Sequence, residues 1–493
     1  MSGRTLGALF PEAKTGAELP VTGLTADSRK AAPGFVFVAV PGTVADGRLF
    51  AAKAAAAGAV AVVAEGERPA DLDPSIPYVA VSDVRRSLAL AASRLSGQQP
   101  ESVIAVTGTS GKSSVTDFVR QILSRLGRDA ASLGTVGIVT NRGATYGSLT
   151  TPDPVTLHAT LARLAEDGIT ELAMEASSHG IEQRRLDGVR LAAVGYTNLG
   201  RDHLDYHATM EDYLAAKLRL FTTLAEPGIP AVVNADGAYA DAVIAASLAR
   251  GLDVLTIGRK GDTVRLLDAR TEGFHQHLRL RAPSGLDRGA NAEYAVRLPL
   301  VGGFQVENAL LAAGLVLATS AGDADRPGVI AALEHLTGVP GRMERIGEVS
   351  GALCLVDYAH KPEALEGVLT ALRPFATGRL TLVFGCGGDR DRGKRPIMGA
   401  IAETLADRVI VTDDNPRSED PAAIRAAILA EAPRATEIGD RAEAIRTAVR
   451  GLQPGDVLVV AGKGHETGQI VGTSVLPFSD HDAVRTAIAE LQA

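Results

Sequence analysis

The sequence predicts an α/β protein built from mostly parallel sheets, and two observations lead to this fold class. Short apolar runs alternate with amphipathic helical patterns along most of the chain, which is typical of βα units in a parallel sheet. The chain has 493 residues, which is too long for one ordinary core and suggests about three domains. We therefore expect three α/β domains along the chain.

The three domains differ in their pattern of elements. Residues 1–100 hold short strands such as "GFVFVAV" and "PYVAV" and end in the polar "SGQQPES". Residues 101–340 alternate strand and helix, except that 252–299 is predicted to form extended hairpins. Residues 341–493 form a more regular series, in which "LCLVDY", "LTLVF", "RVIVT" and "DVLVVAG" are each followed by a helix. This last pattern predicts a Rossmann-like, doubly wound domain.

Composition limits the class of protein. The chain is 46% hydrophobic and 22% charged, and 58 acidic against 50 basic residues give a net charge of −8. This balance argues against a broad nucleic-acid or membrane-binding surface. The two cysteines, Cys354 and Cys386, are too few to staple a chain of this size, which favours a reducing compartment. No apolar stretch has the length of a signal peptide or a membrane span, so we expect a cytoplasmic protein.

A glycine-rich turn lies in "VIAVTGTSGKSSVTDFVRQIL", between an apolar strand and an amphipathic helix. Backbone N–H groups and the helix N-terminus can bind phosphate oxygens there, Lys112 can neutralise them, and Ser113 can ligate Mg²⁺. The P-loop template has a glycine where Val106 stands, so this is a variant with Gly108 and Gly111 as its glycines. We expect a central P-loop ATPase domain that binds a nucleoside triphosphate.

Acidic and imidazole side chains follow two further strands. Glu175 ends the strand in "MEASSHG", where a metal-binding carboxylate is expected, although Ser177 and Ser178 could simply cap a helix. The loop "TNLGRDHLDYH" contains His203 and His207, which favour a metal or phosphate site over ordinary loop polarity. Lys217, on the helix "MEDYLAAKLRLF", is by itself interpreted as a solvated lysine. No N-K-x-D or T-K-x-D guanine reader follows the loop, which weakens a GTPase-switch interpretation.

The stretch "VIVTDDNPRSED" joins a predicted strand, Val409–Thr412, to the polar residues 413–417. Asp-Asn-Pro is ordinary turn chemistry, so a solvated turn is one interpretation. The alternative is a binding site for a molecule that carries both an ammonium and a carboxylate, because α/β folds bind ligands beyond the carboxyl ends of their strands.

A series of short motifs spans nearly the full chain in one order: "TGTSGKSS", "LTTPD", "MEASSHG", "TNLGRDHLDYH", "YLAAK", "GGFQVENALLA", "PGRMERI", "VDYAHKP", "GCGGDRDRGKRP", "DNPR" and "GKGHE". This order resembles the Mur ligases, which are ATP-dependent amide-forming enzymes of peptidoglycan precursor synthesis. Within the family, the motifs are similar to those of members that add meso-2,6-diaminopimelate.

The resemblance implies a function for each domain. Residues 1–100 would bind the UDP substrate, residues 101–340 would bind ATP, and the Rossmann-like residues 341–493 would bind the amino acid. The implied reaction joins meso-diaminopimelate to the D-Glu carboxylate of UDP-N-acetylmuramoyl-L-alanyl-D-glutamate through an acyl phosphate, with ATP and Mg²⁺. It serves cell-wall biogenesis, and with it cell shape and division, and the protein would be a monomer.

The resemblance also implies roles for individual residues. Catalytic roles fall to Lys112, Glu175, His203 and Lys217. The metal ligands would be Ser113, Glu175, His203 and Lys217, the lysine as a carbamate that gives Mg²⁺ an anionic oxygen pair. The ATP contacts would be Gly108, Thr109, Ser110, Gly111, Lys112, Ser113, Ser114, Asn308, Arg342, Asp357, Tyr358 and His360.

The resemblance implies separate sets of contact residues for the UDP substrate and for diaminopimelate. The UDP-substrate contacts would be Ser28, Thr43, Val44, Ala45, Thr150, Thr151, Ser177, Gln183 and Arg185. The diaminopimelate contacts would be Arg390, Asp414, Asn415, Pro416, Arg417, Gly462 and Glu466. Arg417 could hold a carboxylate through two hydrogen bonds, and an acidic residue could hold an ammonium. The 413–417 loop would then determine specificity.

Three positions depart from the family pattern. Ser110 and Gln305 each stand where an asparagine is usual, which alters a polar contact near ATP without abolishing it. Leu149 replaces a polar residue and leaves one substrate contact without its usual side chain. Three alternatives remain: the homologue that adds L-lysine, a folylpolyglutamate synthase-like ligase, and a non-catalytic nucleotide switch. "ADSRK" and "DNPR" argue against the second, and the four catalytic residues argue against the third.

Overall fold

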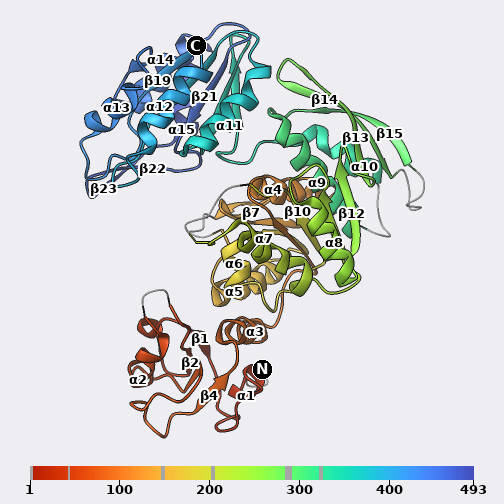
Figure 1. Cartoon of the computed structure of the whole chain (residues 1–493), viewed down its shortest axis with the longest axis vertical. Coiled ribbons are helices and arrows are strands. Elements are labelled where there is room, and N and C mark those ends of the chain that lie inside the picture. Colours follow the sequence, from red (N-terminus) through yellow and green to blue (C-terminus); the bar gives the residue numbers. More distant parts are fainter. Residues whose placement is uncertain are drawn as a thin grey trace. The chain divides into compact units, whose positions relative to one another are not determined.

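The computed structural model of the chain (Figure 1) separates into two compact units, Met1–Lys112 with Leu123–Leu255, and Ser113–Ile122 with Thr256–Ala493. Each unit is an α/β assembly, as expected. The structure describes residues 4–42, 45–145, 150–200, 206–283, 291–320 and 326–492.

The N-terminal part of the first unit is a small parallel sheet with the strand order β1-β2-β3-β4. Both faces of the sheet are covered by apolar side chains. One face packs against α3 (Val84–Ser96), whose N-terminus is capped by the Asp83 carboxylate. The other elements are α1 (Leu6–Leu9), β1 (Gly23–Thr25), η1 (Ser28–Lys30), β2 (Phe35–Val38), η2 (Gly47–Phe50), α2 (Ala51–Ala56), β3 (Ala61–Glu65) and β4 (Tyr78–Val81).

A larger sheet follows, with the order β15-β14-β13-β12-β11-β10-β5-β9-β6-β7-β8, and its strands from β11 to β8 in this order belong to the first unit. Its central strands are parallel and buried along their length, so they appear in the sequence as continuous apolar runs. The antiparallel β7 and β8 extend one edge. The strands are β5 (Ser102–Thr107), β6 (Ala130–Gly134), β7 (Gly137–Thr140), β8 (Gly143–Thr145), β9 (Glu171–Glu175), β10 (Ala193–Tyr196) and β11 (Pro230–Asn234).

The helices of this region follow the predicted pattern. The phosphate-loop helix is α4 (Lys112–Arg125). The helix expected around 211–224 is α7 (Met210–Arg219), and its last turn continues as a π-helix, Leu220–Leu224. The remaining helices are α5 (Pro154–Glu166), α6 (Ser178–Glu182) and α8 (Ala240–Arg250).

The extended hairpins predicted for residues 252–299 are present, and most of them belong to the second unit. The strands β13 (Val264–Glu272), β14 (His275–Pro283) and β15 (Asn291–Leu298) pair in antiparallel order after β12 (Asp253–Gly258). The helix α9 (Gly303–Thr319) is buried almost all round, which explains its uniformly apolar sequence. The smaller elements α10 (Arg326–Ala332) and η4 (Leu333–His335) follow.

The C-terminal sheet has the order β16-β17-β21-β18-β19-β20, and all its strands except the edge strand β16 run parallel. Helices α11, α12 and α13 pack on one face, and α14 and α15 on the other. This arrangement confirms the doubly wound prediction. The strands are β16 (Glu344–Val349), β17 (Ala352–Asp357), β18 (Leu380–Phe384), β19 (Arg408–Val411), β20 (Thr436–Glu437) and β21 (Val457–Ala461).

The parallel strands place the loops after β17, β18, β19 and β21 at the same edge of the C-terminal sheet. A short hairpin, β22 (Gly468–Val471) and β23 (Ser474–Pro477), follows β21, and sequence patterning did not predict it. The helices are α11 (Pro362–Leu372), η5 (Arg373–Phe375), α12 (Lys394–Leu405), α13 (Pro421–Leu429), α14 (Arg441–Arg450) and α15 (Asp480–Gln492).

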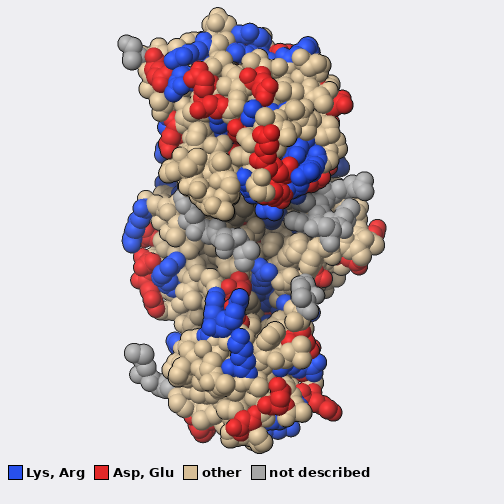
Figure 2. All heavy atoms as spheres, turned by 90° about the vertical axis from the view of Figure 1, so that its left-hand side faces the viewer, with Lys and Arg blue, Asp and Glu red and all other residues tan. Residues whose placement is uncertain are grey.

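Three further features can be set beside the composition. Cys354 and Cys386 are both unpaired and buried. Among the residues described, no helix is long and apolar enough to cross a membrane. On the face shown in Figure 2, basic and acidic side chains are interspersed.

Candidate functional site

The phosphate loop connects β5 to α4, and its glycines are required by its geometry. Gly108 has φ +147° and Gly111 has φ +86°, conformations that side-chain-bearing residues rarely adopt. A Cβ atom at Gly108 would also lie 1.8 Å from the Thr197 hydroxyl oxygen. The turn therefore presents bare backbone immediately before the N-terminus of α4, which suits a phosphate group.

Residues at the end of β10 hold this loop in place. The Thr197 hydroxyl donates to the Ser110 carbonyl at 2.7 Å, and the Asn198 side-chain oxygen accepts from the Ser110 N–H at 3.1 Å. The Thr109 N–H donates to the Asn198 carbonyl at 2.9 Å. Ser110, one of the three departures from the family pattern, is thus held through its backbone groups.

Two lysines reach the loop from different helices. The Lys112 ammonium donates to the carbonyls of Gly108 and Thr109 at 2.9 and 2.8 Å. Lys217, on α7, is only 2% exposed and donates to the same Gly108 carbonyl at 2.8 Å. Its ammonium also lies 4.3 Å from the centre of the Tyr213 ring. The interpretation of Lys217 as a solvated lysine is therefore wrong.

Glu175 is the last residue of β9, as the sequence predicted. Its carboxylate accepts from the Thr135 N–H at 2.8 Å and from the Thr135 hydroxyl at 3.3 Å. A Cβ atom at Gly134 would lie 2.1 Å from this carboxylate, so the position of the glutamate depends on that glycine.

Two of the predicted metal ligands, Glu175 and Ser113, fit Mg²⁺ in their chemistry, because a carboxylate and a hydroxyl are hard oxygen donors. Lys217 would fit only as a carbamate, because its ammonium is a hydrogen-bond donor here. Glu175 holds its carboxylate at the end of β9, and Ser113 lies in the first turn of α4. The described residues contain no group of three or more histidine, cysteine or acidic side chains able to hold a metal. His203 lies outside the described residues.

Several predicted UDP-substrate residues form one hydrogen-bonded chain beside Glu175. The Thr151 hydroxyl donates to the Glu175 carbonyl at 3.0 Å, and the Ser177 hydroxyl donates to Thr151 at 3.0 Å. The Arg185 guanidinium donates to the Thr151 carbonyl at 2.6 Å and to the Gln183 side chain at 2.8 Å. Ser177 also caps α6, which confirms the capping interpretation for this residue.

The same row of hydrogen-bonded residues leads to a cavity of about 410 Å³ in the first unit, a volume typical of small-molecule sites. Burial lowers the pKa of the Arg185 guanidinium, which lines this cavity and would gain from an anionic ligand. Of the other predicted contacts, Ser28 begins η1 beside the lining residue Asp27, and the Thr150 hydroxyl lies 3.0 Å from that of Thr135. Ala45 precedes η2. Thr43, Val44 and Leu149 lie outside the described residues. The lining includes Leu24, Asp27, Lys30, Arg85, Asp153, Gln183 and Arg185.

The remaining predicted ATP contacts lie in the second unit. The buried Asp357 carboxylate accepts from the N–H groups of Met343 and Ala359, both at 2.7 Å, and burial raises its pKa. The Arg342 guanidinium lies over the Tyr358 ring, 4.9 Å from its centre. These contacts place a guanidinium against an aromatic ring at the carboxyl end of β17.

Two further predicted ATP contacts, Asn308 and His360, are buried and half-buried, respectively. His360 lies with its Nδ1 atom 2.9 Å from the Tyr358 carbonyl, and burial lowers the pKa of its ring. Asn308 on α9 donates to the side chain of Gln305 at 3.0 Å. The departure at Gln305 therefore places an amide oxygen against the asparagine predicted to contact the nucleotide.

The 413–417 loop lies at the carboxyl edge of the C-terminal sheet and is largely buried rather than solvated. Asp414 is 8% exposed and Asn415 4% exposed, and Pro416 is buried. Arg417 has φ +51° and donates to the Gly388 carbonyl at 2.9 Å. The interpretation as a solvated turn is therefore wrong.

Two other loops contribute to this edge of the sheet, one after β18 and one after β21. Arg390 is exposed in the loop after β18. Gly462 follows β21 with φ +117°, and a Cβ atom there would lie 2.6 Å from the Asp414 carboxylate. Glu466 lies four residues further on and accepts a hydrogen bond from the Asn415 amide at 2.9 Å. The structure thus brings together Asp414, Asn415, Gly462 and Glu466.

Family models match the chain in three consecutive segments. Residues 20–96 match "Mur ligase family, catalytic domain", residues 106–316 match "Mur ligase middle domain", and residues 341–464 match "Mur ligase, glutamate ligase domain". The chain belongs to the Mur ligase family. The predicted family and the three-domain Mur ligase architecture are therefore confirmed.

The chain is similar to known ligases over nearly the whole length of both proteins. It is 55% identical over 493 residues to the UDP-N-acetylmuramoyl-L-alanyl-D-glutamate--2,6-diaminopimelate ligase of Agrobacterium fabrum, covering 99% of this chain and 98% of that protein. The ligase of the same name from Bradyrhizobium diazoefficiens is 56% identical over 477 residues, 96% of each chain. A solved structure of a ligase with that name has a TM-score of 0.74 at 35% identity and covers 100% of both chains.

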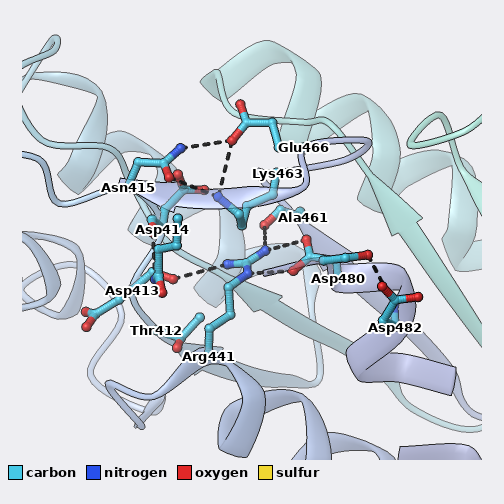
Figure 3. A network of polar contacts seen from close by, with 12 residues as sticks. Thr412, Asp413, Asp414, Asn415, Arg441, Ala461, Lys463, Glu466, Asp480 and Asp482 are labelled. Carbon is cyan, nitrogen blue, oxygen red and sulfur yellow. Dashed lines mark hydrogen bonds and ion pairs between the residues drawn. The ribbon is translucent and has the colours of Figure 1, made fainter. Parts of the chain in front are cut away.

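Among the described residues of this Mur ligase, two fully buried cations near the 413–417 loop were not predicted from the sequence. Lys463 is fully buried and donates to Asn415 and Glu466 (Figure 3). Arg441 on α14 is also fully buried and makes two hydrogen bonds, at 2.7 and 2.8 Å, to Asp480. The "GKGHE" motif contains Lys463, but nothing in its sequence distinguishes a buried lysine from a solvated one.

Proposed function

We propose that this Mur ligase joins meso-2,6-diaminopimelate to the D-Glu carboxylate of UDP-N-acetylmuramoyl-L-alanyl-D-glutamate with cleavage of ATP to ADP and phosphate. The full-length similarity to ligases named for these substrates carries the proposal. The polar loops at the carboxyl edge of the C-terminal sheet support it, because they combine cationic, anionic and amide side chains.

In the first step, the D-Glu carboxylate attacks the γ-phosphorus of ATP, the bond to ADP breaks, and an acyl phosphate forms. Lys112 and the N–H groups of the phosphate loop neutralise the developing charge, after the Lys112 ammonium leaves the carbonyls that it contacts. Ser113, Glu175, His203 and a carbamylated Lys217 would hold Mg²⁺, which supplies further charge neutralisation when bound.

In the second step, the amine of diaminopimelate attacks the acyl carbon, and phosphate leaves as the amide forms. The 413–417 loop and the loop after β21 orient the amino acid for this attack. We assign its distal carboxylate to the Arg417 guanidinium and an ammonium group to the Glu466 carboxylate. L-Lysine lacks the distal carboxylate, so Arg417 would favour diaminopimelate.

The division of labour among the segments belongs to the same proposal. Residues 1–100 and the cavity that Arg185 lines would bind the UDP substrate, residues 101–340 would bind ATP, and residues 341–493 would bind the amino acid. The nucleotide contacts in the second unit would be Asn308, Arg342, Asp357, Tyr358 and His360. We place the reaction in the cytoplasm, where ATP is available, and expect a monomer.

The test is phosphate release from ATP by the purified protein with Mg²⁺ and UDP-N-acetylmuramoyl-L-alanyl-D-glutamate, with meso-diaminopimelate or L-lysine added in parallel. We expect release with diaminopimelate and a tripeptide product detected by mass spectrometry. Release with L-lysine alone would keep the ligase and overturn the assignment of Arg417. If neither amino acid supports release, a folylpolyglutamate synthase-like activity or a nucleotide switch would replace the proposal.

A further inference from the structure

A fully buried lysine connects the two loops that contain the proposed amino-acid contacts. Lys463 is 0% exposed and lies between the 413–417 loop and Glu466 (Figure 3). Its ammonium donates to the Asn415 side-chain oxygen at 3.0 Å and to one Glu466 carboxylate oxygen, Oε2, at 3.2 Å. A buried ammonium is costly unless it is paired in this way, so the contact requires an explanation.

The contacts of Lys463 determine how the Asn415 amide is oriented. The amide oxygen accepts from the Lys463 ammonium at 3.0 Å and from the Ile470 N–H at 2.9 Å. Because both neighbours are donors, the oxygen must face them, and the amide nitrogen must face Glu466, to which it donates at 2.9 Å. Asn415 therefore presents an N–H donor on the side of the Glu466 carboxylate.

The same lysine determines how the Glu466 carboxylate is used. Its Oε2 atom accepts from both Lys463 and Asn415. Oε1 is the oxygen that these two contacts leave available to a further donor. Glu466 is itself half-buried, so an ammonium group of a ligand could reach Oε1.

We propose that Lys463 is a positioning residue for the amino-acid substrate, because it fixes the amide of Asn415 and the carboxylate of Glu466 in the orientations that bind the substrate ammonium. This inference rests on the proposed function. It goes beyond that function in one respect. It states that a fully buried side chain, which is not itself a substrate contact, controls the affinity for one of the three substrates.

The test measures the KM for each of the three substrates in two variants of the full-length protein, Lys463→Met and Lys463→Gln. Methionine matches the length of lysine but removes the donors, whereas glutamine restores an N–H donor without the charge. For Lys463→Met we expect the KM for meso-diaminopimelate to rise about tenfold or more, as for the loss of a charge-assisted hydrogen bond. The KM values for ATP and the UDP substrate should change less than about twofold. Lys463→Gln should recover part of the loss.

A matched control separates positioning from general destabilisation. Val459→Ala removes buried volume in β21, the strand that precedes the loop of Lys463, and leaves the polar contacts of that loop in place. It should lower the melting temperature while leaving the KM for diaminopimelate unchanged. If Lys463→Met does not fold, the Lys463→Gln variant supplies the KM comparison.

The outcomes also separate this inference from the proposed function. No diaminopimelate-dependent release by the wild-type protein would overturn the proposed function itself. Wild-type activity with an unchanged KM for diaminopimelate in both Lys463 variants would overturn the positioning role alone. Equal increases in the KM of all three substrates would also overturn it, because they would indicate a loss of structure rather than of orientation.

Discussion

Lys112 and Lys217 donate hydrogen bonds to the same carbonyl oxygen, that of Gly108, at 2.9 and 2.8 Å. Two ammonium groups therefore converge on one backbone acceptor inside the phosphate loop. One belongs to the loop helix and the other to the separate helix α7, which ties the two helices to the same turn. The proposed function requires Lys112 to turn to a bound phosphate, whereas the burial of Lys217 keeps its side chain beside the loop.

The first prediction concerns the carbamate proposed for Lys217. Lys217→Arg keeps a positive charge but cannot form a carbamate, so kcat should fall about a hundredfold or more, as when one preorganised electrostatic contact is lost. Initial rates of phosphate release measure this effect, and ¹³C-bicarbonate should label the wild-type protein but not the variant. Lys53→Arg on the exposed face of α2 is the control. An arginine variant with full activity would rule out the carbamate.

The second prediction concerns Arg417. Arg417→Ala should raise the KM for meso-diaminopimelate about a hundredfold, because it removes a two-hydrogen-bond contact to a carboxylate. The KM for the UDP substrate should stay within about twofold of the wild-type value. Arg417→Lys, which keeps the charge but not the planar fork, should fall between the two. Equal losses for both substrates would contradict the assignment of the loop.

The third prediction uses the glycine beside Glu175. Gly134→Ala would place a methyl group 2.1 Å from the Glu175 carboxylate, so this carboxylate must move. We expect kcat to fall about tenfold or more from its displacement, with a much smaller effect on the melting temperature. Gly367→Ala, where an added Cβ meets nothing within 4 Å, is the matched control and should behave as the wild type. An unchanged kcat in Gly134→Ala would argue against a catalytic role for Glu175.

The fourth prediction concerns the buried pair of Arg441 and Asp480 in Figure 3. Arg441→Met leaves a buried carboxylate without its partner and should lower the free energy of unfolding of this region by about 3–5 kcal/mol. Replacing both residues, as Arg441→Met with Asp480→Leu, should recover much of that loss. Hydrogen exchange of the β19 and β21 amides reports the local free energy. Arg29→Met, at the exposed pair with Asp27, should have a far smaller effect.

The fifth prediction is a dependence of stability on pH. His158 is 3% exposed, its Nε2 atom lies 3.1 Å from the Asp187 carbonyl, and burial lowers its pKa below the ordinary 6.5. Above that pH the ring is neutral in both states, and its contribution to stability is fully present. As the pH falls below 6.5, the unfolded chain takes up the proton first and is stabilised.

The melting temperature should therefore fall as the pH is lowered from 6.5, the ordinary histidine pKa, to roughly 5. His158→Gln keeps an N–H donor but cannot titrate, so it should reduce this fall. The reduction should be partial, because burial also lowers the pKa of His360 and His465. If the melting temperature of the variant falls as steeply as that of the wild type, His158 is excluded as a source of the pH dependence.

Most of the fold could be predicted from the sequence because buried parallel strands appear there as continuous apolar runs. β5, β9, β18, β19 and β21 are almost entirely buried, and all were expected at these places. The hairpin β22–β23 was missed because its side chains are half-buried or exposed. Strands of that kind carry no apolar pattern to distinguish them from a loop.

The site could be predicted only in part, for a related reason. Motifs identify residue types and their order along the chain, so Glu175 and the phosphate loop were found. Burial of a charged side chain depends on contacts between distant segments, such as those of Lys463 with Asn415 and Arg441 with Asp480. No local pattern reports such contacts, and lysine and arginine are usually exposed.

The two native thiols have a practical consequence. Burial raises the pKa of Cys354 to about 12 and that of Cys386 to about 11, so neither forms the reactive thiolate at neutral pH. A cysteine introduced at Leu49 or Val475, whose side chains are 72% and 67% exposed, would react with a maleimide dye while the native ones stay silent. A fluorophore pair at these two positions, one in each unit, would report in real time how the spacing of the units responds to each substrate.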